Sequence, residues 1–282
     1  FVERNYNLVE LGPRNTGKSY VYRELSPYSI LVSGGEATVP SLFVNLATGR
    51  IGMVGHWDIV AFDEVAGLKK LKDPSAIQIL KDFMESGSFS RGKEEISANA
   101  SLVFVGNLNV DVDMAVKTSH LFISFPKEMQ DLALLDRIHA YLPGWELPKM
   151  HSDFIGRHYG FVIDYFAEIL HGLREEPVGT ILDRYFQLGR SLNKRDEKAV
   201  RKTVSGLVKL LHPNLRVREE ELEEYLKIAM EMRRRVKQQL KKMGGIEFWD
   251  TRFAYLRVQD GIETEVPVPE MGTGGIIPEE AL

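Results

Sequence analysis

The 282-residue sequence contains no cysteine. This excludes a disulfide framework, thiolate zinc sites and a cysteine nucleophile, and it is typical of a reducing compartment. The sequence also has no hydrophobic run near the ~18 residues of a membrane-spanning helix and no signal-peptide pattern. We therefore expect a cytoplasmic protein without a membrane partner. Positive and negative charges nearly balance, since 36 Lys and Arg stand against 40 Asp and Glu and the net charge is −4. Contact with nucleic acid would therefore need a locally basic surface.

Hydrophobic residues make up 44% of the sequence, and its 24 Gly and 12 Pro are close to average usage. This composition excludes collagen-like and disordered chains and indicates a globular protein with a real core. The chain lacks a starting Met and ends in a segment rich in Pro and Gly, which is typical of a linker. We therefore expect flanking domains in the parent protein.

Residues 1–150 alternate short apolar runs with helical stretches, which indicates an α/β domain with a mostly parallel sheet covered by helices. The pattern predicts strands at 7–11, 29–32, 58–62, 101–106 and near 137–142, and helices at 18–25, 41–48 and 73–86. Residues 120–125 are either a further edge strand or a competitor for the fifth position.

Residues 151–245 have helical apolar spacing, which predicts an all-helical lid domain with helices at 161–173, 180–188, 196–211 and 219–243. Residues 246–282 are expected to hold a short strand or hairpin at 248–258, followed by a linker toward an absent domain.

The strongest motif is GPRNTGKS at residues 12–19, which follows a predicted strand and begins a helix. It fits the phosphate-binding pattern G-x-x-x-x-G-K-[ST], in which successive backbone N–H groups point at phosphate oxygens. Lys18 would neutralise the β and γ phosphates, and the Ser19 hydroxyl would bind Mg²⁺. The predicted ATP-binding residues are Gly12, Pro13, Arg14, Asn15, Thr16, Gly17, Lys18, Ser19 and Tyr20.

A second motif is the apolar run of residues 59–62, which ends in Asp63 and Glu64. The carboxyl ends of buried parallel strands face the ligand crevice of such a sheet. Asp63 would hold Mg²⁺ through water, and Glu64 would orient and deprotonate the water that attacks the γ phosphate. The pair favours hydrolysis over transfer to a hydroxyl.

Together the two motifs resemble those of the AAA+ ATPases, a class with a three-layer α/β/α core and a helical lid. The resemblance implies a polar sensor at the end of the fourth strand, which is Asn107, with Asn109 as the alternative. The segment LLDR at 134–137 resembles the one that precedes the fifth strand in Lon-type ATPases. This resemblance implies that Arg137 is an arginine finger for the neighbouring subunit. In AVR at 199–201 it implies that Arg201 senses the phosphate of its own subunit.

Longer segments, among them WDIVAFDEVAG and LLDRIHAYLPGW, resemble the BrxL family of Lon-like ATPases from BREX phage-exclusion systems. This resemblance implies a homo-oligomeric ring, either a hexamer or a double hexamer, that hydrolyses ATP with Mg²⁺ and acts on double-stranded DNA in phage defence, with other defence proteins as possible partners. A protein unfoldase that feeds a protease domain is the alternative, and a scaffold that only assembles on ATP is a third hypothesis. We can place no Ser/Lys proteolytic dyad in the chain.

Two loops are candidates for contact with the substrate. Residues 87–100 resemble a hairpin of helicase-like AAA+ proteins, with Arg91 and Lys93 at its tip, and contact with DNA and a solvent-exposed turn are equally compatible with it. Residues 49–55 form the second candidate. The basic run at 233–242 is more typical of a solvated surface than of a nucleic-acid face. His151 and His158 favour core or capping roles over a metal site.

Overall fold

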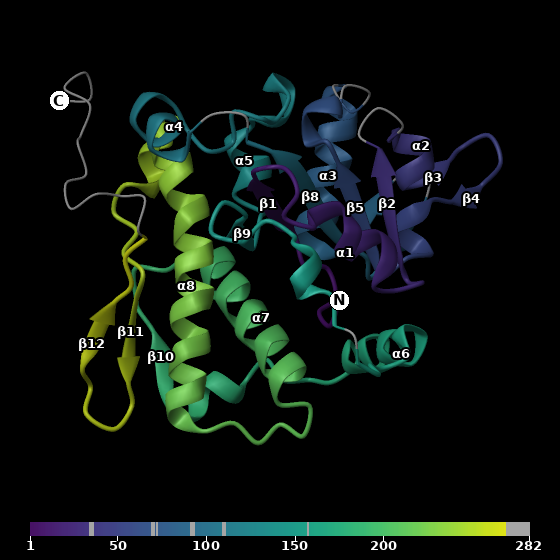
Figure 1. Ribbon diagram of the computed structural model, residues 1–282. Coiled ribbons are helices and arrows are strands. Elements are labelled where there is room, and N and C mark those ends of the chain that lie inside the picture. The colour runs from purple at the N-terminus through teal and green to yellow at the C-terminus, as the bar shows by residue number, and fades with distance from the viewer. Residues whose placement is uncertain are drawn as a thin grey trace.

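A five-stranded parallel sheet forms the centre of the molecule (Figure 1). The computed structural model describes residues 1–33, 37–68, 71, 73–90, 94–108, 111–156 and 158–268. The sheet has the order β2-β5-β8-β1-β9, and every neighbouring pair is parallel. Its strands are β1 (Leu8–Gly12), β2 (Ser29–Ser33), β5 (Ile59–Asp63), β8 (Ser101–Asn107) and β9 (Ala140–Pro143). The predicted α/β class and its five strands are confirmed.

Helices cover the sheet on both faces, which explains why the strands are mostly apolar. One face packs against α1 (Lys18–Glu24) through Tyr22. The other face carries the largest core, to which α3 (Pro74–Ser86) contributes one apolar stripe. The shorter helices of this region are α2 (Val39–Leu42), α4 (Val112–Thr118) and α5 (Leu132–Leu135). Single 3₁₀ turns connect elements at Met53–Gly55, Val65–Gly67, Lys127–Met129, Ser152–Phe154 and Ile246–Phe248.

Helix α3 begins and ends where the sequence predicts. The Asp73 carboxylate accepts a hydrogen bond from the Ser75 amide at 2.8 Å, and Pro74 occupies the first turn. Gly87 ends the helix in the left-handed region, at φ 74°. These local signals suffice to fix both ends.

The helix predicted at 41–48 is wrong. Helix α2 ends at Leu42, and a hairpin of β3 (Val44–Asn45) and β4 (Arg50–Ile51) follows. Asn45 starts the turn, since its side chain accepts a hydrogen bond from the Ala47 amide at 3.0 Å. Residues 120–125 are not a strand either, because 121–124 form turns and β9 is the fifth strand.

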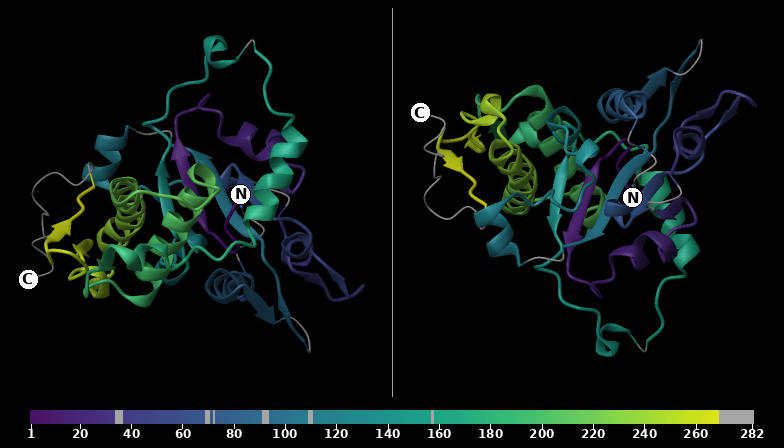
Figure 2. Two further views of the ribbon diagram at one scale, coloured as in Figure 1. Left: turned by 90° about the horizontal axis from the view of Figure 1, so that it is seen from below. Right: turned by 90° about the horizontal axis from the view of Figure 1, so that it is seen from above.

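A second hairpin, of β6 (Ser88–Ser90) and β7 (Glu95–Ser97), follows α3. Its predicted tip residues, Arg91 and Lys93, lie outside the described residues. The two hairpins project from the same side of the molecule (Figure 2). Aromatic contacts join their bases, with the rings of Phe43 and Phe89 4.9 Å apart and those of Phe83 and Phe89 6.0 Å apart. The hairpins and the end of α3 therefore share one apolar anchor.

The region after residue 150 is mostly helical, with α6 (Ile163–Leu173), α7 (Lys194–Leu211) and α8 (Glu219–Lys242). It is not all-helical. The predicted helix at 180–188 is a 3₁₀ turn at Ile181–Arg184 followed by β10 (Phe186–Leu188). This strand pairs with β11 (Ala254–Arg257), which also pairs with β12 (Glu263–Glu265). The pairing is long-range, so local periodicity could not show it.

Helix α7 lies at the end of the sheet where the parallel strands begin (Figure 1). From α7, the Thr203 hydroxyl lies 2.6 Å from that of Tyr6, and Lys202 donates to the carbonyls of Arg4 and Asn5. All these partners precede β1. Helix α8 runs along β9, with Val236 and Leu240 in the main core. No helix in the described part of the chain is long and apolar enough to cross a membrane.

Candidate nucleotide-binding site

Three neighbouring strands end in residues of the predicted motifs, at the carboxyl-terminal edge of the sheet. Gly12 ends β1 and is paired in register with Asn107, the last residue of β8. Asp63 ends β5, the strand on the other side of β8. The structure therefore brings the phosphate loop, the acidic pair and the predicted sensor to one edge, as the sequence predicts for a parallel sheet.

The loop after β1 depends on close backbone contact. A Cβ on Gly12 would lie 2.4 Å from the carbonyl carbon of Gly144, so only glycine fits there. Asn15 and Gly17 have left-handed φ angles of 67° and 86°. The Asn15 carbonyl accepts a hydrogen bond from the Met150 amide at 2.6 Å. These contacts keep the loop curled above the start of α1.

Lys18 lies inside this curl, with only 7% of its surface exposed. Its ammonium donates to the Thr16 hydroxyl at 3.0 Å and to the carbonyls of Gly12 and Pro13. Burial lowers the pKa of Lys18, and the negative charges of Glu10 and Asp63 oppose that shift. The chain thus holds a buried cation where phosphates of a nucleotide would lie.

The Ser19 hydroxyl donates a hydrogen bond to an Asp63 carboxylate oxygen at 3.0 Å. The two residues come from α1 and β5, which lie far apart in sequence. Hydroxyl and carboxylate oxygens are the ligands that Mg²⁺ prefers, usually together with water and substrate phosphates. This pair therefore fits a magnesium ion bound beside a nucleotide.

Glu64 is exposed and has a left-handed backbone, with φ 52°. Its amide donates to Asp63 Oδ1 at 3.0 Å, which ties the strained residue to the carboxylate that accepts from Ser19. Strained backbone of this kind is concentrated at functional sites, because surrounding structure must hold it in place. With this conformation the backbone leaves the direction of β5 at Glu64, at the end of the sheet where the phosphate loop lies.

The other predicted residues of this edge are also in place. The Leu108 amide donates to the Gly12 carbonyl at 3.1 Å and so fixes Asn107 beside the phosphate loop. Arg14, Asn15 and Tyr20 are exposed around the loop, Pro13 is partly buried, and Thr16 is buried. Asn109, the alternative sensor, lies outside the described residues.

Sequence reasoning missed Glu10, which is only 5% exposed in β1, next to the central strand β8. Burial raises the pKa of its carboxyl, while Lys18 and a hydrogen bond from Tyr22 act in the opposite direction. An acidic residue inside an apolar strand directly before the loop was the available signal. Glu10 places a carboxyl beneath the buried lysine.

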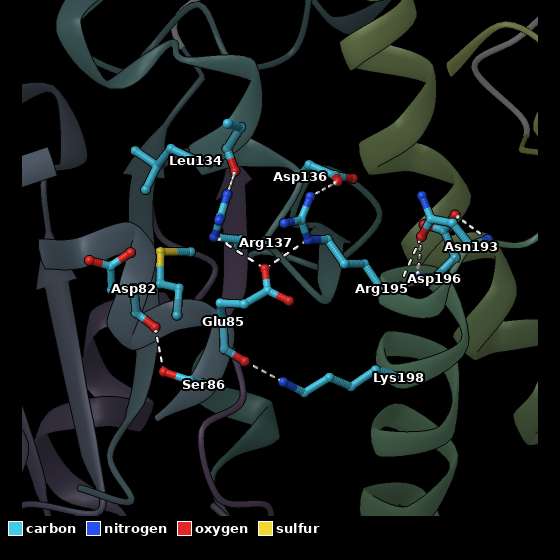
Figure 3. A network of polar contacts seen from close by, with 12 residues as sticks. Asp82, Glu85, Ser86, Leu134, Asp136, Arg137, Asn193, Arg195, Asp196 and Lys198 are labelled. Atoms are coloured by element: carbon cyan, nitrogen blue, oxygen red, sulfur yellow. Dashed lines mark hydrogen bonds and ion pairs between the residues drawn. The ribbon is translucent and has the colours of Figure 1, made fainter. Parts of the chain in front are cut away.

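Arg137 lies shortly before β9, so it is at the end of the sheet where the strands begin, opposite the phosphate loop. Its Nε is 3.2 Å from Glu85 Oε2, and its Nη1 donates to the Ala133 carbonyl (Figure 3). Arg195, at the start of α7, binds the same Glu85 oxygen at 2.7 Å. The length of a strand therefore separates Arg137 from the phosphate loop of its own chain.

Arg201 does not reach the phosphate loop of its own chain. It lies on α7, at the same far edge as Arg137, where its guanidinium binds the Asp183 carboxylate through two hydrogen bonds of 2.7 and 3.1 Å. This arrangement does not bring Arg201 to the nucleotide site predicted for its own subunit, because α7 packs where the strands begin.

Half of the cations in the basic run on α8 are buried and lie on neither a solvated surface nor a nucleic-acid face, whereas Lys242 is exposed. Arg233, Arg235 and Lys237 are at most 1% exposed. Arg233 and Lys237 bind the carboxylates of Asp136 and Asp196 inside the protein. These cations therefore join α8 to α7 and to the segment before β9, and sequence could not show this because both acidic partners come from other elements.

The remaining candidates form no metal site. His151 is exposed and pairs with Asp153 at 3.1 Å, and His158 is exposed. Among the described residues, no three His, Cys, Asp or Glu side chains are placed to hold a metal ion. The 49–55 segment forms the exposed hairpin strand β4 and a 3₁₀ turn.

The parallel sheet and the loop with its buried lysine define a P-loop nucleotide-binding protein. The comparisons with known proteins are more specific, since residues 1–254 match the family model "Lon-like protease BrxL-like, ATPase domain". The chain belongs to this family and is an ATPase domain. It is 57% identical over 279 residues to "Lon-like protease BrxL" of Bacillus cereus (strain H3081.97) and 54% identical over 278 residues to that of Escherichia coli O9:H4 (strain HS). These alignments cover 99% of this chain and 41% and 40% of the relatives, so the chain spans about two fifths of their length.

Proposed function

We propose that this chain is the Mg-ATP-hydrolysing motor of a ring-forming protein that acts on double-stranded DNA in phage defence. The observation that carries the hydrolytic part is the 3.0 Å contact between Ser19 and Asp63 above the buried Lys18. A structural glycine-rich turn would need neither the buried cation nor the carboxylate opposite the hydroxyl.

Each residue at this edge has a role in the proposed hydrolysis. The loop amides and Lys18 bind the β and γ phosphates, and Lys18 offsets the charge that develops on them. Glu64 orients the attacking water and accepts its proton. Asn107, fixed beside Gly12, donates to that water or to a γ-phosphate oxygen. A magnesium ion held by Ser19 and Asp63 would neutralise phosphate charge.

The ring follows from the position of Arg137. An arginine finger stabilises the transition state by contact with the γ phosphate, and its removal typically costs a factor of ~10³–10⁵ in turnover. Arg137 lies an entire strand away from its own loop, so a neighbouring subunit must supply the phosphate that it contacts. A closed ring, as a hexamer or double hexamer, gives every subunit such a neighbour.

Duplex DNA is the proposed substrate because two hairpins project together from one side of the core. One of them carries Arg91, Gly92 and Lys93 in its sequence. Cationic tips contact a phosphate backbone without reading sequence. Other phage-defence proteins are proposed as further partners. The second candidate is a protein unfoldase, which the name of the relatives, "Lon-like protease BrxL", favours.

The experiment compares the ATPase rate of the complete protein alone, with linear duplex DNA and with an unfolded polypeptide. We expect duplex DNA to raise kcat, and the stimulation to weaken as salt rises. Stimulation by the polypeptide alone would favour the unfoldase. Absence of any turnover would favour a scaffold that only assembles on ATP.

A further inference from the structure

One carboxylate, that of Glu85, holds two arginines from different elements (Figure 3). Glu85 lies in the last turn of α3. Its Oε2 is 3.2 Å from Arg137 Nε and accepts a hydrogen bond from Arg195 Nε at 2.7 Å. The Glu85 carbonyl also accepts a hydrogen bond from Lys198. Helix α3, the start of α7 and the segment before β9 therefore meet at this residue.

The contact of Arg137 with Glu85 is an ion pair without a hydrogen bond, because the buried Nε of Arg137 finds no acceptor in proper geometry. The Arg137 side chain is only 14% exposed. Within the part of the chain that the structure describes, its Nη1 donates to a carbonyl of its own short helix, that of Ala133. A guanidinium that serves a neighbouring subunit must be exposed, so this position is a withdrawn one.

The surroundings of Arg137 are held much more firmly. Asp136 accepts hydrogen bonds from Arg195 at 3.0 Å and from Arg233 at 2.8 Å, and it also binds Lys237. Asp136 is 3% exposed, and such buried charge pairs are costly to break. The backbone beside the finger is thus fixed, and the Arg137 side chain can move alone.

Glu85 is also coupled to the hairpins. It lies between Phe83, which packs against Phe89 of β6, and Gly87, where α3 ends and the β6–β7 hairpin begins. A shift of the hairpin base moves the end of α3, and with it the Glu85 carboxylate.

We propose that Glu85 is a positioning residue that keeps Arg137 withdrawn until a ligand moves the β6–β7 hairpin and breaks the ion pair. This inference rests on the proposed role of Arg137 as a finger for the neighbouring subunit. It assigns to Glu85 the link between the substrate hairpin and hydrolysis at the adjacent site.

The test is Glu85→Gln in the complete protein, which keeps the shape of the side chain and removes its charge. The matched control is Asp82→Asn, on the same helix, whose carboxylate accepts a hydrogen bond from the exposed Gln78 at 2.8 Å and contacts neither arginine. We expect modification of Arg137 by an arginine-specific dicarbonyl, measured by mass spectrometry, to rise several-fold in Glu85→Gln and to stay unchanged in the control. The basal kcat should also rise several-fold at constant KM for ATP, and stimulation by duplex DNA should shrink.

Glu85→Asp is the second variant, for use if Glu85→Gln does not assemble. It retracts the carboxylate from Arg137 by one methylene, so Arg137 modification and kcat should rise by an intermediate amount. Unchanged Arg137 modification, or an unchanged or lower kcat in rings of normal size, would overturn the role of Glu85. Failure of the finger hypothesis is a separate result, since it would appear as full turnover in Arg137→Ala. The dicarbonyl measurement does not depend on turnover and still tests the ion pair in that case.

Discussion

Replacement of Asp136 by Asn should strongly destabilise the chain, because the carboxylate is buried among cations. Arg195, Arg233 and Lys237 all bind it, and the last two are at most 1% exposed. In the unaltered protein, the two buried cations Arg233 and Lys237 are balanced by the two buried carboxylates of Asp136 and Asp196. In Asp136→Asn only Asp196 remains as their partner, at 2.8 and 3.4 Å, so the cluster would carry one excess positive charge.

Breaking a buried ion pair by removing one partner costs about 3–5 kcal/mol. For a domain of this size, 1 kcal/mol lowers Tm by roughly 2–4 °C, so a fall on the order of 10 °C is expected. Asp183→Asn is the matched control, because it removes a carboxylate that binds Arg201 through two hydrogen bonds but is 49% exposed. Exposed pairs contribute only ~0–1 kcal/mol.

Urea unfolding followed by circular dichroism measures the free energy of unfolding of both variants.

The loss of stability at acid pH provides an independent check. Burial alone would raise the pKa of Asp136, but Arg233 and Lys237 outweigh it and the pKa lies below its usual value. Stability from this group is therefore complete above the ordinary aspartate pKa of about 3.8 and is lost as pH falls through the lowered value. Equal, small losses in Asp136→Asn and Asp183→Asn would refute the account of the cluster.

Three further predictions concern the site. Gly12→Ala should abolish ATP binding and lower Tm, because the new Cβ would lie 2.4 Å from the backbone of Gly144. Gly172→Ala is the control, because no atom lies within 4 Å of its Cβ, and it should raise helix stability by about 0.5–1 kcal/mol. Calorimetry measures ATP binding, and thermal melting measures Tm. Arg137→Ala should bind ATP normally but lose at least ~10³-fold in kcat. Mixing inactive Arg137→Ala with inactive Lys18→Ala subunits should restore turnover, because some intact loops then face intact fingers, and a mixture that stays inactive would contradict action between subunits.

Local sequence signals predicted the parts of this fold that depend on neighbouring residues. The caps of α3 and the glycines of the phosphate loop are of this kind, and the five strands follow from their apolar runs. The shared edge of Gly12, Asp63 and Asn107 was predictable as well, because parallel strands place their carboxyl ends together.

Features that depend on distant partners could not be predicted. Strand β10 has apolar spacing that fits a helix, and only its pairing with β11 makes it a strand. The basic run on α8 is partly buried because Asp136 and Asp196 meet it from two other elements. Arg201 was assigned from a motif alone, and the packing of α7 at the far edge of the sheet places it away from the loop.

The most direct test of the central claim uses Glu64→Gln and Lys18→Ala in the complete protein, with ATP binding measured by calorimetry and hydrolysis measured as phosphate release. We expect Glu64→Gln to bind Mg-ATP as tightly as the unaltered protein while kcat falls at least ~10²-fold, as for loss of a general base. Lys18→Ala should lose binding itself, since the buried cation is removed from the phosphates. Undiminished ATP affinity in Lys18→Ala, or normal turnover in Glu64→Gln, would contradict the assignment of this edge of the sheet as the site of hydrolysis.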